Sequence, residues 1–336
     1  MKVILNIPIE PLEERYSNQW RKWFSNAFAA EGFHVVDIDP PATTSGLIHR
    51  GSFLDVVETN QYKTLQTLQI INQIILLSRD IEIILFFHDL WHPGLSNIAY
   101  VRDGLQLPNI RICGCLHAGS YDDWDFLNKV GMRPWAMHLE NGWFGKIADQ
   151  IYVATGFHKN LLASRRRVDP DKIIVTGFPM YPDFISEQYS EKDNIIVFPH
   201  RLDIEKQPVL FDKLCSELTN MNWRCIKSKE VVATKKEYYE LLKQSKIAIS
   251  FARQETWGIA MQEAVLCGCV PVCPNSLSYP EMYSNMFLYD TFEEAVKKVR
   301  EFMEHPPIES VKYQQQAILN SGRKAIPMII KNMKQL

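Results

Sequence analysis

Short apolar runs alternate with longer amphipathic segments along the first half of the chain. The runs are rich in β-branched and aromatic residues, which favours strands, and the longer segments repeat apolar residues at helical spacing. We predict strands at residues 3–7, 34–38, 82–87, 110–116, 150–153 and 173–175, and helices at 17–31, 61–79, 134–148 and 158–166. This alternation predicts βαβ units and a parallel sheet, which binds ligands at the carboxyl ends of its strands.

A second alternating series follows a polar stretch at residues 186–193, which has the composition of a linker. Its predicted strands are 195–198, 223–226, 247–251, 270–273 and 286–289, and its predicted helices are 207–218, 235–243, 258–267 and 291–305. The tail from 308 has helical periodicity and no strand pattern. We therefore expect an α/β protein with two Rossmann-like domains, residues 1–180 and 194–306, and a C-terminal helix, 307–336, that packs back on the first domain.

The bulk composition agrees with two ordinary globular domains. A chain of 336 residues suits two cores, and 46% hydrophobic with 23% charged residues supports them without disulfides or metals. The formal net charge of −2 argues against a protein that coats nucleic acid through a general basic field. Any nucleic-acid contact would come from a local patch.

The cysteines and the chain start favour a cytoplasmic protein. Seven cysteines include no Cys-x-x-Cys pair, and we interpret them as buried, reduced thiols rather than a metal site. The N-terminus lacks the apolar core of a signal peptide, and no apolar stretch is long enough for a membrane span. We expect neither secretion nor integral membrane association, with the host cytoplasm as the location if the protein is viral.

Three common catalytic signatures are missing from the sequence. The dinucleotide-binding Gly-x-Gly-x-x-Gly, the P-loop and His-Glu-x-x-His are absent. An ordinary dehydrogenase, a P-loop kinase and a zinc hydrolase are therefore disfavoured.

Two cations follow the strand predicted at residues 195–198. Arg201 lies just beyond the strand, and Lys206 lies five residues later at a predicted helix start. A guanidinium and an ammonium at the carboxyl edge of a sheet suit a nucleotide diphosphate, whose phosphate charge they would neutralise. The alternative is a solvated arginine and a helix lysine that pair with Asp203 or Glu205.

Two glutamates lie eight positions apart after the strand predicted at residues 247–251. Glu255 precedes a helix that opens near Trp257 and Gly258, where free backbone N–H groups can bind a hydroxyl-rich ligand, and Glu263 lies about two turns into that helix. The alternative for Glu255 is a helix-terminus acid that stabilises the helix dipole. For Glu263 a purely structural role is less favourable, because a buried carboxylate without a partner is costly.

These two segments resemble those of a known family. The sequence His-Arg-Leu-Asp-Ile-Glu-Lys at 200–206 is similar to its Gly-Arg-Leu-x-x-x-Lys motif, and Glu255-x7-Glu263, followed by Ala264 and Gly268, is similar to its Glu-x7-Glu motif. The family is that of retaining GT-B glycosyltransferases, which includes glycogen and sucrose synthases. The resemblance implies a GT-B fold, in which two parallel sheets face each other across a cleft, and transfer of a hexose or pentose.

The resemblance also implies roles for individual residues. Arg201 and Lys206 would bind the donor diphosphate, Glu263 the nucleotide ribose and Glu255 the transferred sugar, with Trp257 and Gly258 beside them. The co-substrate would be a UDP- or GDP-sugar, with no metal and no obligatory cofactor. We expect a monomer or weak dimer.

His117 is the candidate catalytic residue of the first domain. It follows the strand predicted at 110–116, and the family has a histidine beside the donor sugar at the corresponding place. An isolated histidine in this setting is about as often structural.

The acceptor is the open part of the prediction. The first loop, which runs Ile-Pro-Ile-Glu-Pro from residue 7, lacks the family's usual glycines. Candidate acceptors are hydroxymethylcytosine in phage DNA, a polysaccharide, a lipid-linked sugar and a small molecule. The aromatic segment 16–24 and the basic segment 165–167 could contact an acceptor, although the first is more typical of core and the second of a solvated helix end. A non-catalytic sugar-nucleotide-binding protein is the alternative of another class.

Overall fold

The chain folds into two compact units, which are described separately. The computed structural model describes residues 2–11, 19–41, 55–77, 81–182, 192–218 and 222–336. The first unit comprises residues up to 154, residues 158–179 and residues 324–336. The second comprises residues 155–157 and 180–323.

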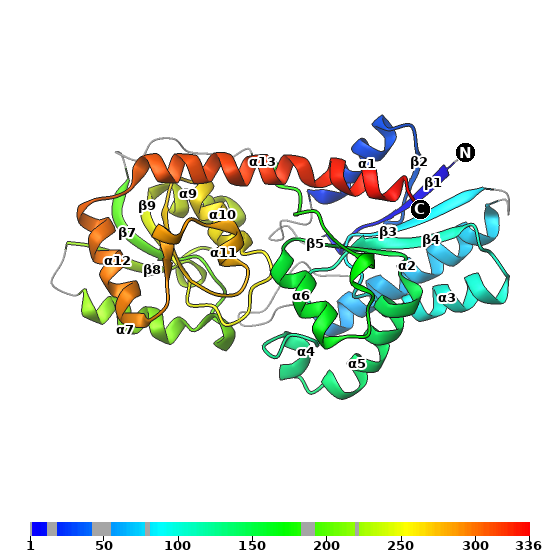
Figure 1. Cartoon of the computed structure of the whole chain (residues 1–336), viewed down its shortest axis with the longest axis horizontal. Coiled ribbons are helices and arrows are strands. Elements are labelled where there is room, and N and C mark those ends of the chain that lie inside the picture. The colour runs from blue at the N-terminus through cyan, green and yellow to red at the C-terminus, as the bar shows by residue number, and fades with distance from the viewer. Residues whose placement is uncertain (1, 12–18, 42–54, 78–80, 183–191, 219–221) are drawn as a thin grey trace. The chain divides into compact units, whose positions relative to one another are not determined.

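The first unit contains a six-stranded parallel sheet in the order β2-β1-β3-β4-β5-β6. Its strands are β1 (Lys2–Ile7), β2 (His34–Asp37), β3 (Glu82–Phe87), β4 (Ile110–Cys115), β5 (Gln150–Val153) and β6 (Ile173–Val175). Its helices are α1 (Trp20–Ala30), α2 (Val56–Leu76), α3 (Leu95–Gly104), α4 (Phe126–Lys129), α5 (Arg133–Gly142) and α6 (Gly156–Arg165), with a π-helical turn at Trp143–Ile147 and a 3-10 turn at Pro170–Lys172. Figure 1 shows α2 and α3 along one face of this sheet and α1 on the other.

The aromatic residues of α1 form part of the core. Trp20, Phe24 and Phe28 are fully buried and lie on one face of the helix, and Phe24 and Phe28 contact Phe86 of β3. Trp23 is half-buried, and residues 16–18 lie outside the described part of the chain. Within the described part of segment 16–24, the buried aromatic side chains are thus core residues, as their helical spacing predicts.

The second unit contains a five-stranded parallel sheet in the order β11-β10-β9-β7-β8. The strands are β7 (Asp193–Phe198), β8 (Arg224–Lys227), β9 (Ser245–Ile249), β10 (Val270–Pro274) and β11 (Leu288–Tyr289). The helices are α7 (Pro208–Glu217), α8 (Ser228–Val231), α9 (Lys235–Gln244), α10 (Ile259–Leu266), α11 (Tyr279–Met282) and α12 (Phe292–Glu304), with 3-10 turns at Ile204–Lys206 and Asn285–Phe287. Figure 1 shows α9 and α10 side by side in this unit.

The C-terminal helix α13 (Ile308–Met333) contributes its last turns to the first unit. The Lys334 ammonium lies 2.6 Å from the Glu31 carboxylate after α1. The Gln150 amide of β5 donates to the Asn332 carbonyl at 3.3 Å. The expected return of the C-terminal helix to the first domain is therefore confirmed.

The sequence pattern missed helix α3. Its buried residues Leu95, Ile98 and Ala99 follow helical spacing, which is the signal that could have revealed it. The sequence Trp-His-Pro-Gly at 91–94 precedes it and is typical of a loop, and the helix has only ten residues. A short helix directly after a Pro-Gly pair thus escaped the prediction.

The seven cysteines are all free thiols, and five of them are buried. Cys215 of α7 and Cys225 of β8 are half-buried, and their side chains are hydrogen-bonded to each other. Within the described part of the chain, no group of three or more His, Cys, Asp or Glu side chains is placed to hold a metal ion. Among the described helices, none is both long and apolar enough to cross a membrane.

Candidate functional site

The strand order of the second unit marks a ligand-binding edge. The chain moves outward from β7 to β8 on one side and to β9 on the other, so the direction of winding reverses between β7 and β9. Open parallel sheets bind ligands at the carboxyl ends of the strands at such a point. Residues 199–206 follow β7 and residues 250–258 follow β9, so the topology places both predicted segments at this edge.

Lys206 links the two segments. Its side chain is only 7% exposed, and its ammonium lies 3.2 Å from Oε2 of Glu255. The same ammonium donates to the Gln254 carbonyl at 2.5 Å. Lys206 therefore pairs across the sheet edge with Glu255. The alternative drawn from the sequence had paired it with Asp203 or Glu205.

Arg201 makes ion pairs with Asp203 and Glu205, the two acids that a purely structural role predicts for it. Its guanidinium lies 3.0 Å from the Asp203 carboxylate and 3.2 Å from the Glu205 carboxylate, and 34% of its side chain remains exposed. These two acids orient the guanidinium. Because a guanidinium has five N–H donors, it can bind a further anion on its exposed side.

Glu255 lies in the loop between β9 and α10. Burial raises the pKa of this carboxyl, but the adjacent Lys206 ammonium and the backbone N–H of Gly258 outweigh burial and hold the pKa below its usual value. The Trp257 N–H donates to Glu255 Oε1 at 3.4 Å. Glu255 is therefore an ionised, oriented carboxylate at neutral pH.

Gly258 gives this loop its shape. It caps α10 with a φ of 65°, a left-handed conformation that side chains disfavour. An added Cβ would also lie 2.9 Å from Cε of Met282. The turn that places Glu255 and Trp257 before the helix thus depends on glycine at this position.

Glu263 lies inside α10 and is held by a neighbouring helix. Its carboxylate oxygen Oε1 is 2.6 Å from the Lys235 ammonium and 2.9 Å from the Tyr239 hydroxyl, both on α9. Sequence reasoning singled out Glu263 but missed these two partners. Their four-residue separation, which places them on one helix face, was the available signal.

His200 is a third residue of this region that sequence reasoning did not single out. It is buried, and its Nε2 has no hydrogen-bond partner in the structure. Burial, reinforced by the nearby Lys206 ammonium, lowers its pKa to about 3. A neutral imidazole therefore stands where the resembling family has glycine.

His117 lies in the first unit, just after β4. Its Nε2 is 2.8 Å from the His88 carbonyl, to which it donates, and its ring lies 5.2 Å from Trp20 and 4.9 Å from Phe178. The carbonyl and the two rings fix the orientation of the imidazole. Of the predicted site residues, His117 alone belongs to the first unit, whereas the other six lie in the second.

The basic segment 165–167 is partly structural. Arg166 is buried and pairs with the buried Glu140 at 2.7 Å, and it also donates to the Ser120 hydroxyl. Arg165 and Arg167 are exposed. The cluster therefore presents two arginines to solvent rather than three.

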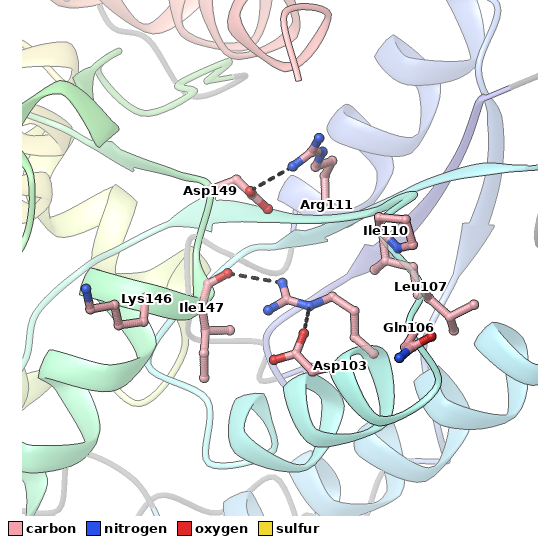
Figure 2. Close-up of a pocket in the computed structure, with 10 residues that line it drawn as sticks. Asp103, Gln106, Leu107, Ile110, Arg111, Lys146, Ile147 and Asp149 are labelled. Atoms are coloured by element: carbon pink, nitrogen blue, oxygen red, sulfur yellow. Dashed lines mark hydrogen bonds and ion pairs between the residues drawn. The ribbon is translucent and has the colours of Figure 1, made fainter.

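A hollow of about 600 Å³ lies in the first unit at the amino ends of strands β4 and β5. The Arg102 guanidinium donates to the Asp103 carboxylate and to the Ile147 carbonyl. Figure 2 shows Arg111 against Asp149. Both arginines are thus paired within the protein. Because ligands of parallel sheets bind at the carboxyl ends of the strands, this amino-end hollow is not the predicted site.

The sequence matches a family of glycosyltransferases over part of its length. Residues 210–325 match the family described as glycosyl transferase-like, a range that contains Glu255 and Glu263 and begins after Lys206. The tRNA-queuosine alpha-mannosyltransferase of Drosophila melanogaster is 31% identical over 148 residues. That match covers 37% of this chain and 39% of the relative's length.

Solved glycosyltransferases share the fold of the whole chain. Sucrose-phosphate synthase from Thermosynechococcus elongatus has a TM-score of 0.70 at 11% identity, covering 100% of this chain and 98% of that one. The alpha,alpha-trehalose-phosphate synthase (UDP-forming) from Burkholderia vietnamiensis has a TM-score of 0.66 at 10% identity, covering 100% of both chains. The resemblance predicted from the two motifs is therefore confirmed: the chain has the GT-B fold, and the comparisons support a glycosyltransferase.

Proposed function

We propose that the chain transfers a sugar from a nucleotide diphosphate to an acceptor hydroxyl with retention of the anomeric configuration. The observation that carries this proposal is the contact between Lys206 and Glu255 at the edge where the winding of the second sheet reverses. A cation for phosphate and a carboxylate for sugar hydroxyls meet there, and Arg201, 34% exposed, belongs to the same loop after β7 as Lys206. The match over residues 210–325 supports the same assignment.

The proposed reaction needs charge stabilisation rather than a side-chain nucleophile. The bond between the anomeric carbon and the diphosphate oxygen breaks, and Arg201 and Lys206 neutralise the charge that develops on the leaving diphosphate. The acceptor oxygen bonds to the anomeric carbon on the face that the diphosphate leaves, and its proton passes to the departing phosphate oxygen. Glu255 holds the sugar hydroxyls, and His117 is proposed to act beside the donor sugar.

We propose UDP or GDP as the donor nucleotide and a modified nucleoside in nucleic acid as the acceptor. A structural neighbour described as UDP-forming supports a uridine donor. The relative from Drosophila is named for transfer to queuosine in tRNA, which supports an acceptor hydroxyl carried by a modified base, as in hydroxymethylcytosine DNA. A base within a duplex would have to be flipped out to reach the donor.

A panel of nucleotide sugars tests the donor site. Thermal shift and slow donor hydrolysis are measured with UDP-, GDP- and ADP-sugars for the wild type, Arg201→Ala and the control Arg224→Ala, whose ion pair with Asp193 is exposed. We expect one nucleotide to stabilise the wild type and the control, and hydrolysis to disappear in Arg201→Ala alone. No shift and no hydrolysis with any nucleotide sugar would refute the donor assignment.

A second assay tests the acceptor. Transfer of radiolabelled sugar is measured to queuosine-containing tRNA, to hydroxymethylcytosine DNA and to matched nucleic acids without the modified base. Polysaccharide, lipid-linked and small-molecule acceptors are assayed in parallel. Label on a modified nucleic acid alone supports the proposal. Label on a polysaccharide, lipid-linked or small-molecule acceptor instead would contradict it, and donor binding without any turnover would indicate a sugar-nucleotide-binding protein.

A further inference from the structure

The carboxylate of Glu263 is held by side chains of α9. The Lys235 ammonium lies 2.6 Å from Oε1, and the Tyr239 hydroxyl donates to the same oxygen at 2.9 Å. Both of these bonds use Oε1, and the Tyr238 hydroxyl, also on α9, hydrogen-bonds to the same carboxylate. These contacts from α9 therefore set the rotation of the carboxylate.

The sequence of α9 fixes both donors in place. Thr234 accepts from the Glu237 N–H, and the Glu237 carboxylate accepts in return from the Thr234 N–H, so the helix begins at Lys235 with a complete capping box. Tyr239 follows four residues later on the same helix face. Both side chains consequently reach one point on α10.

Lys235 has further contacts that restrict its ammonium group. It lies 5.1 Å from the centre of the Tyr238 ring and 4.8 Å from that of the Tyr239 ring. Cation–π contacts of this kind favour a defined position for a lysine that is otherwise flexible. The side chain of Glu263 is only 4% exposed, so the ammonium also offsets the cost of burying its charge.

We propose that Lys235 and Tyr239 are positioning residues that make the donor site selective for a ribonucleotide. By holding Oε1 they orient the carboxylate of Glu263 as the acceptor for a ribose hydroxyl. This inference rests on the proposed function, in which Glu263 binds the ribose. Neither Lys235 nor Tyr239 touches the ribose itself.

Binding of deoxynucleotides tests the proposal. Dissociation constants for UDP and GDP, and for their 2′-deoxy and 3′-deoxy analogues, are measured by calorimetry on the full chain. The wild type is expected to bind the better ribonucleotide about 10- to 100-fold more tightly than one of its deoxy analogues, the range of a charge-assisted hydrogen bond. The ratio of the dissociation constant of the deoxy analogue to that of the ribonucleotide reports on the orientation of Glu263.

Three variants and one control separate orientation from folding. Lys235→Met and Tyr239→Phe are expected to reduce that ratio to within a few-fold of one, whereas Lys235→Arg restores part of it. Lys236→Met is the matched control, because Lys236 is the exposed neighbour of Lys235 on α9, and it keeps the wild-type ratio. Tyr239→Phe removes a single oxygen and keeps the ring, so it tests the proposal even where Lys235→Met folds poorly.

The outcomes distinguish this inference from the proposed function. In one outcome, the wild type binds the ribonucleotide more tightly than the deoxy analogue, and the variants lower the affinity for both nucleotides equally and so keep the ratio. That outcome would overturn the positioning role alone. A wild type that binds neither UDP nor GDP would overturn the donor site and this inference together.

Discussion

The Lys206 ammonium and the Glu255 carboxylate meet at 3.2 Å, with their side chains 7% and 15% exposed. They come from loops after β7 and β9 and are separated by 49 positions along the chain. The pair joins these two loops at the edge of the sheet where ligands of this fold class bind. It therefore contributes both to the stability of the second unit and to the proposed donor site.

Replacing Lys206 should cost stability as well as binding. Lys206→Met leaves Glu255 buried without its cation, which typically costs about 3–5 kcal/mol. We expect a lower melting temperature and no binding of a nucleotide diphosphate. The double variant Lys206→Met/Glu255→Gln removes both charges and should recover part of the stability but none of the binding. A Lys206→Met protein as stable as the wild type would contradict this interpretation of the pair.

Much of the fold was predictable because apolar residues recur at different spacings in strands and in helices. The strands at 82–87, 150–153 and 173–175 were predicted to the residue, since β-branched runs between polar segments have few alternatives. The limits of α2 were not, because its N-cap Asp55 follows residues without a helical pattern. Helix ends depend on capping contacts that periodicity does not report.

The sequence predicted which residues belong to the candidate site, but not which of them contact each other. Motif spacing identified Lys206 and Glu255 separately, but their mutual pairing depends on the adjacency of β7 and β9 in the sheet. The four-residue separation of Lys235 and Tyr239 was a signal, but by itself it indicates only an amphipathic helix with an exposed lysine. The role proposed for Lys235 follows from the packing of α9 on α10, which one sequence does not reveal.

The left-handed conformation of Gly258 gives a second prediction. Gly258→Ala combines the cost of a positive φ, about 1–2 kcal/mol, with a contact at 2.9 Å to Met282. Gly32→Ala is a matched control, since Gly32 has a φ of 85° with open space around its Cβ position and lies in the first unit. Both variants should melt earlier than the wild type, but calorimetry should show weaker nucleotide binding in Gly258→Ala alone. Equal nucleotide affinity in the two variants would show that the turn does not shape the site.

Buried histidines should make the protein sensitive to acid. Burial lowers the pKa of His88, His158 and His200 to about 3. Between pH 6.5 and 3 the unfolded chain binds protons that the folded chain does not, so stability falls as the pH falls, by up to about 1.4 kcal/mol per pH unit for each histidine. Asp125 acts in the opposite direction, because burial raises its pKa to about 7 and its contribution is lost as the pH rises from about 4 to 7.

The three histidines outweigh this one carboxyl, so the melting temperature should drop between pH 7.5 and pH 5.5. His200→Gln removes one titrating group and should reduce the drop, whereas His138→Gln, at an exposed position, should leave it unchanged. Melting curves at the two pH values measure both. A wild-type melting temperature that rises on acidification would refute this assignment of charge states.

The buried pair of Arg166 and Glu140 should be essential for the first unit and irrelevant to nucleotide binding. Arg166→Met leaves a fully buried carboxylate without its cation and removes a donor from the Ser120 hydroxyl, which together should cost about 3–5 kcal/mol. Arg165→Met, next in sequence but exposed and 3.4 Å from Asp123, should cost less than about 1 kcal/mol. Because the proposed donor site lies in the second unit, the folded fraction of each variant should bind the nucleotide with wild-type affinity. Equal melting temperatures for the two variants would mean that the pair contributes no net stability, and a loss of nucleotide affinity in folded Arg166→Met would mean that the two units are coupled.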